Sequence, residues 1–384
     1  MSAVSSLQFG DNLLLIFLLS PYHTGSHAAW ADGYARYSRH EVRLFTMAGQ
    51  FWKWRLQGGA LELAPQVVDA IKAAAQPDAL VVTDMVNVPA LLALARPWLD
   101  GVPVLYYAHE NQLTYPPPPG EKRDLTYGMI NTLSMLCAGT VAFNSLYHLD
   151  EFFAELPRLL KHFPDYNHLE MIPALQARSR VLPVGLDLRR LDRCRPPEKP
   201  AEAPLRIVWN QRWEYDKNPS EFFNALYTLD ALGLPFELAI AGESFGQQPA
   251  EFDEAHERLA SHIVHYGYAP DLETYARLLW EADVVVSTAQ HEFFGISILE
   301  AIYCGCYPLL PRRLSYPELL PEPLHHDHLY HDFDELVERL AWAATHPAAI
   351  RAVKLDHLAA PYAWERLAPL FDGLLNDLVA AAKR

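Results

Sequence analysis

Residues 282–301 read ADVVVSTAQHEFFGISILEA, and this stretch is the most informative pattern in the chain. The apolar run within residues 283–287 predicts a buried strand, and the apolar spacing after Gly295 predicts a helix that begins there. Backbone N–H groups at such a helix start attract anions and hydroxyl oxygens. Glu292 lies in the turn and Glu300 in the helix. The pattern therefore predicts a sugar-nucleotide site, in which one carboxylate holds sugar hydroxyls and the other holds ribose hydroxyls.

Short apolar runs alternate with amphipathic helical patterns on both sides of this stretch. Strands are expected at 13–19, 42–47, 79–83, 102–108, 140–143 and 180–184, and again at 205–209, 236–241, 263–266, 283–287 and 307–310. Helices are expected at 26–37, 65–75, 124–136 and 146–160, and again at 219–232, 251–260, 272–280, 295–303 and 332–345. This alternation predicts an α/β fold with parallel sheets that helices cover on both faces.

A charged, proline-rich segment interrupts the alternation at 192–204, and we interpret it as an interdomain linker. The chain of 384 residues is long enough for two domains. We predict a Rossmann-like acceptor domain at 1–190, a linker at 191–204 and a Rossmann-like donor domain at 205–360. The ligand is expected in a cleft between the two domains, at the carboxyl ends of the strands. The last segment, 361–384, is expected to be a helix that crosses back to the first domain.

The bulk properties exclude several classes of protein. The formal net charge of −16 argues against a general nucleic-acid coat protein, although arginines in the first half could form a local basic surface. The apolar run 13–19 is too short for a signal peptide or a membrane span, so no membrane insertion is expected. The four cysteines are expected to be reduced, which favours the cytoplasm. The sequence predicts no oligomeric state.

No metal or cofactor is expected. The histidines of 325–328 resemble a metal cluster in composition, but adjacent residues in a turn rarely share one metal. Asp332 and Asp334 form a D-x-D pair at the start of an expected helix, where a capping turn is the simpler interpretation.

Two cations follow the first strand of the second domain. Arg212 and Lys217 lie in the segment NQRWEYDKNP, and together they could neutralise a leaving diphosphate. Two surface cations in a loop are the alternative. The residues Phe294, Gly295 and Ile296 at the expected helix start would bind the same donor.

Polar residues also follow two strands of the first domain. Gly25 opens the segment after the first strand and lets a ligand approach the backbone, without the full glycine fingerprint of a nicotinamide site. His109, Glu110 and Asn111 end the strand 102–108, and polar side chains there are costly to bury without partners. His109 could bind a sugar hydroxyl or stabilise charge at the reacting carbon, or it could be a structural histidine.

A loop is expected at 51–55, where Trp52, Lys53, Trp54 and Arg55 alternate aromatic and basic side chains. Such residues stack on bases or sugars and contact phosphates. Packing of the tryptophans into the core is an equally good interpretation.

These motifs together resemble retaining glycosyltransferases with two facing Rossmann domains, known as the GT-B fold. Within that group, the strings WKWR at 52–55 and HENQLTYP at 109–116, together with residues 291–308, closely resemble the tRNA-queuosine mannosyltransferases. The resemblance extends from about residue 20 to residue 321. It implies GDP-mannose as the donor and the cyclopentenediol of queuosine in tRNA as the acceptor.

The resemblance also assigns roles by position. Arg212 and Lys217 would bind the diphosphate, Glu300 the ribose and Glu292 the mannose hydroxyls. His109 would lie beside the transferred sugar, and Gly25 near the phosphates. Catalysis is then expected from His109, Glu292, Arg212 and Lys217, and acceptor binding from Trp52, Lys53, Trp54, Arg55, Glu110 and Asn111.

We expect front-face transfer without a metal, in which the leaving phosphate takes the acceptor's proton. Two alternatives stay open. One is the same chemistry on an envelope lipid or polysaccharide, and the other is a module that binds nucleotide or RNA without turnover.

Overall fold

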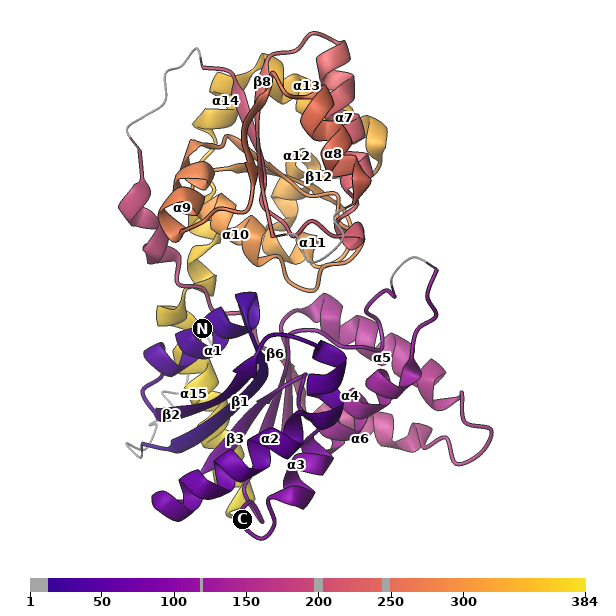
Figure 1. The fold of residues 1–384 in the computed structure, drawn as a ribbon, viewed down its shortest axis with the longest axis vertical. Coiled ribbons are helices and arrows are strands. Elements are labelled where there is room, and N and C mark those ends of the chain that lie inside the picture. The colour runs from indigo at the N-terminus through magenta and orange to yellow at the C-terminus, as the bar shows by residue number, and fades with distance from the viewer. Residues whose placement is uncertain (1–12, 118–119, 197–202, 244–248) are drawn as a thin grey trace, which may run out of the picture. The chain divides into compact units, whose positions relative to one another are not determined.

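The computed structural model describes residues 13–117, 120–196, 203–243 and 249–384 (Figure 1). Two compact units divide the chain. The N-terminal unit contains the described residues of 1–115, 123–186 and 364–384, and the C-terminal unit contains those of 116–122 and 187–363. Residues 197–202 of the predicted linker lie outside the described residues.

The N-terminal unit is built on a six-stranded parallel sheet with the order β2-β1-β3-β4-β5-β6. Its strands are β1 (Leu15–His23), β2 (Glu41–Ala48), β3 (Ala79–Thr83), β4 (Val104–Ala108), β5 (Thr140–Phe143) and β6 (Ser179–Val181). All six strands were predicted from their apolar runs. Residues of β3 and β4 are buried throughout, as expected for strands covered on both faces.

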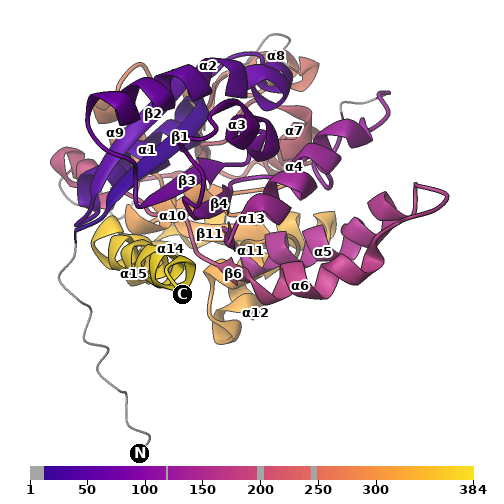
Figure 2. The same cartoon turned by 90° about the horizontal axis from the view of Figure 1, so that it is seen from below.

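Helices cover both faces of this sheet. They are α1 (Gly25–Tyr37), α2 (Trp52–Ala73), α3 (Val88–Leu94), α4 (Leu125–Cys137), α5 (Leu146–Leu160), α6 (Ile172–Ala177) and α15 (Trp364–Ala382). Helix α15 contacts α1, β3 and β4, whereas α2 contacts β1, α3 and α4. Figure 2 shows α2 and α3 on the opposite side of β1 and β3 from α15. Each layer buries apolar residues against the sheet, for example Leu63 and Val67 in α2 and Phe371 in α15.

Two predictions in this unit were wrong. Residues 51–55 are not a loop, because α2 begins at Trp52 instead of residue 65 and contains Pro65 in its interior. Proline suggested a helix start, but Leu56, Leu63 and Val67 are all buried on one face. Their burial stabilises a continuous helix through the proline. Helices α3 and α6 were not predicted at all.

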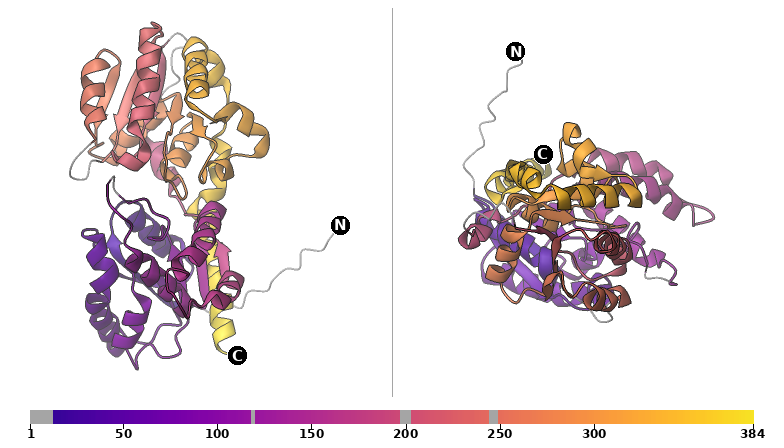
Figure 3. Two further views of the ribbon diagram at one scale, coloured as in Figure 1. Left: turned by 90° about the vertical axis from the view of Figure 1, so that its right-hand side faces the viewer. Right: turned by 90° about the horizontal axis from the view of Figure 1, so that it is seen from above.

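The last helix belongs to the N-terminal unit, and Figure 3 shows it in yellow beside the strands of that unit. Trp364 at its start is fully buried against two glycines, Gly33 and Gly185. A Cβ atom at either glycine would lie 2.1 or 2.3 Å from the Trp364 ring, so no other residue fits without a shift. Further along α15, Asp372 accepts hydrogen bonds from the Tyr34 hydroxyl at 2.9 Å and from the Ser38 hydroxyl at 2.7 Å.

The C-terminal unit contains a second six-stranded parallel sheet with the order β12-β11-β10-β7-β8-β9. Its strands are β7 (Leu205–Trp209), β8 (Phe236–Ala241), β9 (Ile263–Gly267), β10 (Val284–Val286), β11 (Tyr307–Pro311) and β12 (Leu329–Tyr330). Only β12 was not predicted, because two residues carry too short a pattern.

The helices of this unit are α7 (Pro219–Ala231), α8 (Ala250–Arg258), α9 (Leu272–Glu281), α10 (Ile296–Tyr303), α11 (Tyr316–Leu319), α12 (His325–His328), α13 (Phe333–Thr345) and α14 (Pro347–Ala352). Two 3₁₀ helices, η2 (Leu188–Cys194) and η3 (Tyr215–Lys217), also bear on the site. Helix α7 contacts α8 and α13, and α10 contacts α9 and β10. The Asp332 carboxylate accepts a hydrogen bond from the Glu335 N–H at 3.0 Å, which confirms the predicted cap.

The sheet register brings two loops together in the C-terminal unit. Val284 of β10 pairs with Ile207 of β7, so both strands end at the same edge. The segment 210–217 after β7 therefore lies beside the segment 287–295 after β10, where strand ends of parallel sheets bind ligands. Among the described helices, none combines the length and the apolar content needed to cross a membrane.

Candidate functional site

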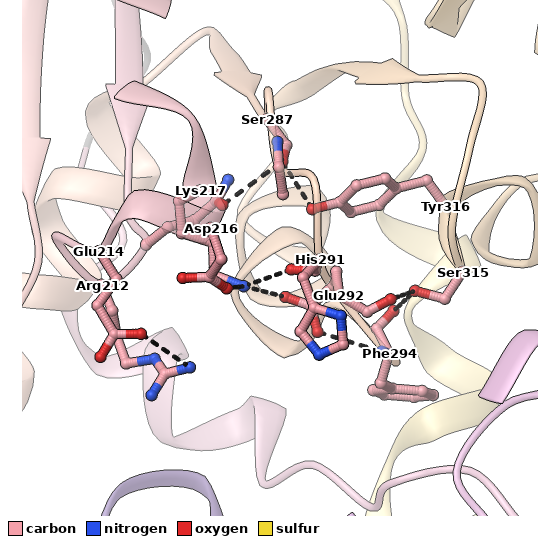
Figure 4. Close-up of polar contacts among 12 residues, drawn as sticks. Arg212, Glu214, Asp216, Lys217, Ser287, His291, Glu292, Phe294, Ser315 and Tyr316 are labelled. Atoms are coloured by element: carbon pink, nitrogen blue, oxygen red, sulfur yellow. Dashed lines mark hydrogen bonds and ion pairs between the residues drawn. The ribbon is translucent and has the colours of Figure 1, made fainter. Parts of the chain in front are cut away.

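Lys217 is the centre of a charged cluster in the C-terminal unit. It lies at the end of η3, and its side chain is only 7% exposed. Figure 4 shows the ammonium group among three oxygen atoms: the His291 carbonyl at 2.8 Å, a Glu292 carboxylate oxygen at 3.3 Å and an Asp216 carboxylate oxygen at 3.3 Å. The structure thus joins the predicted residues Lys217 and Glu292 directly. It also adds Asp216, which the sequence analysis did not single out.

Backbone hydrogen bonds hold the two loops in register around this cluster. The N–H groups of Gln290 and His291 donate to the Asp216 carbonyl at 2.8 and 3.3 Å. The Thr288 hydroxyl also joins the two loops, because it lies at hydrogen-bond distance, 2.9 Å, from the carbonyls of Lys217 and Asn218. Since these bonds connect the ends of β7 and β10, the positions of the cluster's charges follow from the sheet.

The three groups of the cluster keep one another charged. Burial works to lower the pKa of Lys217, but the carboxylates of Glu292 and Asp216 outweigh it and raise that pKa. Burial works to raise the pKa of Glu292, and the Lys217 charge and the Phe294 N–H outweigh it, so the pKa of Glu292 is lowered. Burial also works to raise the pKa of Asp216, but the Lys217 charge outweighs burial, so the pKa of Asp216 is lowered. A buried cation between two carboxylates is the result.

His291 lies in the same loop and stays neutral. Burial first, and then the Lys217 charge, lower the pKa of His291 to about 4. The imidazole therefore adds no positive charge to the cluster near neutral pH.

Arg212 is the accessible cation of this region. Its side chain is 46% exposed and forms an ion pair with Glu214 at 3.5 Å, as Figure 4 shows. Burial raises the pKa of Glu214. Arg212 can therefore meet an incoming anion from solvent, whereas Lys217 is already fixed inside.

The start of α10 is built around Glu292. Gly295 has φ +106°, a value that L side chains rarely adopt, and it precedes the first helical residue, Ile296. The second carboxylate oxygen of Glu292 accepts a hydrogen bond from the Phe294 N–H at 3.1 Å. The Ser315 hydroxyl lies 3.0 Å from the Phe294 carbonyl. The predicted strand–turn–helix is confirmed, and the turn is held by the same carboxylate that contacts Lys217.

Glu300 lies in the middle of α10 and has its own partners. Its carboxylate is buried and accepts hydrogen bonds from Arg190 of η2 and, at 2.7 Å, from the Tyr275 hydroxyl of α9. Neither partner was singled out in the sequence analysis. They lie 110 and 25 residues from Glu300 in the chain, and no sequence pattern connects them.

In the N-terminal unit, the loop after β4 carries His109 and is held by buried polar side chains. The His109 N–H donates to the Asp84 carboxylate at 3.0 Å, and the Asn144 amide donates to the His109 carbonyl at 2.8 Å. Asn131 of α4 donates to the Asp84 carbonyl at 2.9 Å and accepts from the Gln112 N–H at 2.9 Å. This framework fixes the loop by hydrogen bonds, without an ion pair among these five residues.

The His109 ring is enclosed by aromatic rings. Its centroid lies 4.4 Å from that of His27 and 4.8 Å from that of Trp30. Burial first, and then the neighbouring His27 and His148, hold the pKa of His109 well below its usual value. Its Nε2 atom is buried, and no described residue forms a hydrogen bond with it. His109 is thus a neutral imidazole whose buried Nε2 has no hydrogen-bond partner among the described residues.

The residues that follow His109 differ in whether their side chains are available to a ligand. Glu110 accepts a hydrogen bond from the Gln112 amide at 2.8 Å and is partly exposed. Asn111 is fully buried, and its side-chain oxygen accepts from the Leu113 and Thr114 N–H groups at 3.0 and 2.9 Å. The structure therefore gives Asn111 a bracing role inside the loop. Gly25 opens α1 with φ +49° and has open space where a Cβ would lie.

The aromatic and basic residues at the start of α2 are divided between the two interpretations given above, contact with a ligand and packing of the tryptophans into the core. Trp52 packs against Tyr127, with ring centroids 5.1 Å apart, and Lys53 lies over Trp52 at 5.6 Å. Trp54 is 57% exposed instead, and Lys53 is also exposed. Arg55 donates to the Ala48 carbonyl at 3.1 Å. One tryptophan belongs to the core and the other to the surface.

Comparison with known proteins identifies both halves of the chain. Residues 15–186 match the family model described as tRNA-queuosine alpha-mannosyltransferase N-terminal, and residues 193–322 match glycosyl transferases group 1. The chain is 31% identical over 332 residues to the tRNA-queuosine alpha-mannosyltransferase of Drosophila melanogaster, which covers 85% of each protein. The chain belongs to the tRNA-queuosine alpha-mannosyltransferase family. As the glycosyl transferases group 1 match also indicates, it is a glycosyltransferase.

More distant relatives support the fold of this family. A GDP-mannose-dependent alpha-(1-6)-phosphatidylinositol dimannoside mannosyltransferase of Mycobacterium tuberculosis is 29% identical over 145 residues, 36% of this chain and 37% of that protein. The structure of sucrose-phosphate synthase from Thermosynechococcus elongatus matches with a TM-score of 0.69 at 16% identity, over 96% of this chain and all of that one. Starch synthase IV of Arabidopsis thaliana matches 96% of this chain and 100% of that chain at 12% identity, with a TM-score of 0.66. The predicted GT-B fold is confirmed.

Proposed function

We propose that this member of the queuosine mannosyltransferase family transfers mannose from GDP-mannose to the cyclopentenediol of queuosine in tRNA, with retention of configuration. The observation that carries the proposal is the Lys217–Glu292 contact of 3.3 Å at the start of α10. It places a fixed cation beside a carboxylate that faces the same helix start. A diphosphate and the hydroxyls of its hexose need these two kinds of group side by side.

In the proposed donor complex, Arg212 and Lys217 stabilise the diphosphate as it leaves. Glu292 binds mannose hydroxyls, and the residues 294–296 offer helix-start N–H groups to the donor. Glu300 accepts hydrogen bonds from the ribose. The two cations supply the positive charge that a leaving diphosphate requires, so the proposed reaction needs no metal.

His109 is proposed to bind the transferred sugar as a neutral imidazole. Burial of its Nε2 atom without a partner among the described residues costs free energy, and a hydrogen bond to a sugar hydroxyl would recover it. Because the pKa of His109 lies well below its usual value, this group is a poor base for the acceptor. The leaving phosphate oxygen therefore takes the acceptor's proton in the proposed front-face transfer.

The tRNA is proposed to contact the N-terminal unit. Lysines and arginines number 15 against 18 acidic residues there, compared with 16 against 29 in the C-terminal unit. The repulsion of a polyanion is therefore smaller at the N-terminal unit. Trp54, Lys53 and Arg55 at the start of α2 offer one exposed ring and two cations, and Glu110 offers an acceptor for the cyclopentenediol hydroxyls. A tRNA acceptor also supports the cytoplasm as the proposed location.

The direct test is transfer in vitro. The protein is incubated with GDP-mannose and queuosine-containing tRNA, the tRNA is digested, and the nucleosides are measured by mass spectrometry. We expect mannosyl-queuosine, with the α configuration by NMR, and no product from the same tRNA carrying guanine in place of queuosine. Queuosine that stays unmodified in the presence of GDP-mannose would contradict the proposal. This holds even if a different nucleotide sugar gives a product.

The alternative acceptor is an envelope lipid, and the name of the mycobacterial relative gives phosphatidylinositol dimannoside for that protein. That similarity covers 36% of the chain, against 85% for the queuosine enzyme, so it accounts for less than half of this protein. Adding lipid extracts to the same assay separates the two acceptors, since a mannosylated lipid without mannosyl-queuosine would favour the alternative. Donor binding without any product would favour a non-catalytic module.

A further inference from the structure

The Glu300 carboxylate is held from two sides inside the C-terminal unit. Arg190 donates a hydrogen bond to one carboxylate oxygen, and the Tyr275 hydroxyl donates to the other at 2.7 Å. The side chain of Glu300 is 8% exposed, whereas that of Arg190 is 36% exposed. A buried carboxylate is costly unless it is paired and hydrogen bonded, and these two residues meet that requirement.

A second layer fixes the orientation of one of these partners. The Asn210 amide, at the end of β7, donates to the Tyr275 hydroxyl at 3.2 Å and to the Ser297 carbonyl at 2.8 Å. One side chain therefore ties Tyr275 to the first turn of α10, the helix that carries Glu300. The orientation of the carboxylate is set by a network that spans β7, α9, α10 and η2.

The network leaves acceptor positions on Glu300. A carboxylate offers about four lone-pair positions, and Arg190 and Tyr275 account for one on each oxygen. The remaining positions can accept hydrogen bonds from a vicinal diol, which donates two O–H groups at adjacent carbons.

We propose that Arg190 is a positioning residue for nucleotide binding, which together with Tyr275 orients Glu300 to accept hydrogen bonds from the ribose hydroxyls of the donor. This rests on the proposed function, in which Glu300 binds the ribose. Arg190 acts through Glu300 and needs no contact with the donor. Loss of Arg190 leaves the buried carboxylate with Tyr275 as its remaining hydrogen-bond donor in the network, so the carboxylate turns toward other partners and the ribose loses its acceptor.

The test measures nucleotide binding by titration calorimetry with GDP and with 2′-deoxy-GDP, for the full chain and for Arg190→Ala, Arg190→Lys and Glu300→Gln. We expect the unchanged protein to prefer GDP. In Arg190→Ala, the affinity for GDP should fall about 10- to 100-fold, the loss seen for residues that orient the ligands of a metal. The affinity for 2′-deoxy-GDP should change little, so the preference approaches that of Glu300→Gln, and Arg190→Lys should retain part of it.

Arg193→Ala is the matched control, because Arg193 is an exposed arginine of the same 3₁₀ helix. It should leave both affinities unchanged. Equal losses for GDP and 2′-deoxy-GDP in Arg190→Ala would show a merely structural role and overturn the proposal. An unchanged preference in Arg190→Ala, or no preference in the unchanged protein, would also overturn it. The titration needs no acceptor, so a failure to mannosylate queuosine would leave its result intact.

Discussion

The two ligand regions of this molecule are built from different interactions. In the C-terminal unit, Lys217 lies between Asp216 and Glu292, and exposed Arg212 pairs with Glu214. In the N-terminal unit, hydrogen bonds with the buried side chains of Asp84, Asn131 and Asn144 hold the His109 loop, and His109 itself is neutral. The first region is prepared for a charged diphosphate, and the second for uncharged hydroxyl groups.

This difference separates two properties that a transferase needs. Charges that are fixed before binding provide electrostatic stabilisation without reorganisation during the reaction. A hydrogen-bonded loop with a neutral imidazole orients its partner without placing a positive charge beside it. Changes in the C-terminal region should therefore act on donor binding and turnover, and changes in the N-terminal region on the sugar and acceptor.

The largest expected effect is that of Lys217→Ala. Removing this cation takes away charge stabilisation of the leaving diphosphate, so kcat/KM should fall by at least about 100-fold. The variant should also lose stability, because Asp216 and Glu292 lose the cation that pairs with them. Steady-state kinetics and urea unfolding measure both. Lys354→Ala, which removes an exposed lysine of the same unit, is the control, and activity near that of the control would remove the diphosphate role.

The next largest effect is the pH dependence of stability that His291 causes in the C-terminal region. The pKa of His291 is lowered to about 4 from an ordinary value of 6.5, so the unfolded chain binds its proton first. Stability from this group is complete above pH 6.5 and is lost as the pH falls toward about 4, by an amount on the order of 3 kcal/mol. The free energy of unfolding at pH 7 and pH 5 should differ less in His291→Asn than in the unchanged protein. An equal difference in both proteins would contradict the low pKa.

A neutral framework residue should act differently from a charged one. Asn131→Ala removes the hydrogen bonds donated to the Asp84 carbonyl and the Tyr106 hydroxyl and the one accepted from the Gln112 N–H of the His109 loop, and should reduce stability by about 2 kcal/mol. Transfer to tRNA should slow, while calorimetry should find the affinity for GDP unchanged. Leu133→Ala, at an exposed position of the same helix, is the control. A loss of GDP affinity in Asn131→Ala would contradict the assignment of donor binding to the C-terminal region alone.

The smallest expected effect is at the exposed start of α2. Trp54→Ala should weaken tRNA binding by about 1 kcal/mol, or roughly fivefold, if its ring stacks on a base. Stability should be unchanged because the side chain is 57% exposed. Filter binding with queuosine-containing tRNA measures the affinity, and Leu61→Ala, an exposed apolar position of the same helix, serves as the reference. Equal affinities for Trp54→Ala and Leu61→Ala would remove the stacking role.

Much of the fold could be predicted from apolar runs and helical spacing. Every strand except β12 was expected, because buried parallel strands are short continuous apolar segments. The errors have local causes. Pro65 suggested the start of a helix that begins at Trp52, and residues 88–94 carry only seven residues of helical pattern, too few to be distinguished from a strand or a loop.

The candidate site could be predicted in part. Arg212, Lys217 and Glu292 follow strand ends, where the sequence signal and the chemistry coincide. Asp216 was visible in the same segment, but its burial beside Lys217 was not. Asn111 was expected to face an acceptor, and the structure shows it bracing its own loop. Polarity alone does not reveal whether a side chain faces a ligand or the backbone.

By itself, the sequence determined the alternation of strands and helices, the positions of the charged residues at strand ends and the family of the protein. These follow from local patterns and from short strings of residues. Only the tertiary structure decided that Arg190 and Tyr275 hold Glu300, that Asp216 shares Lys217, and that Asn131 supports His109. Such contacts join residues far apart in the chain, and burial makes each of them matter, because a polar group removed from water needs a partner wherever the fold provides one.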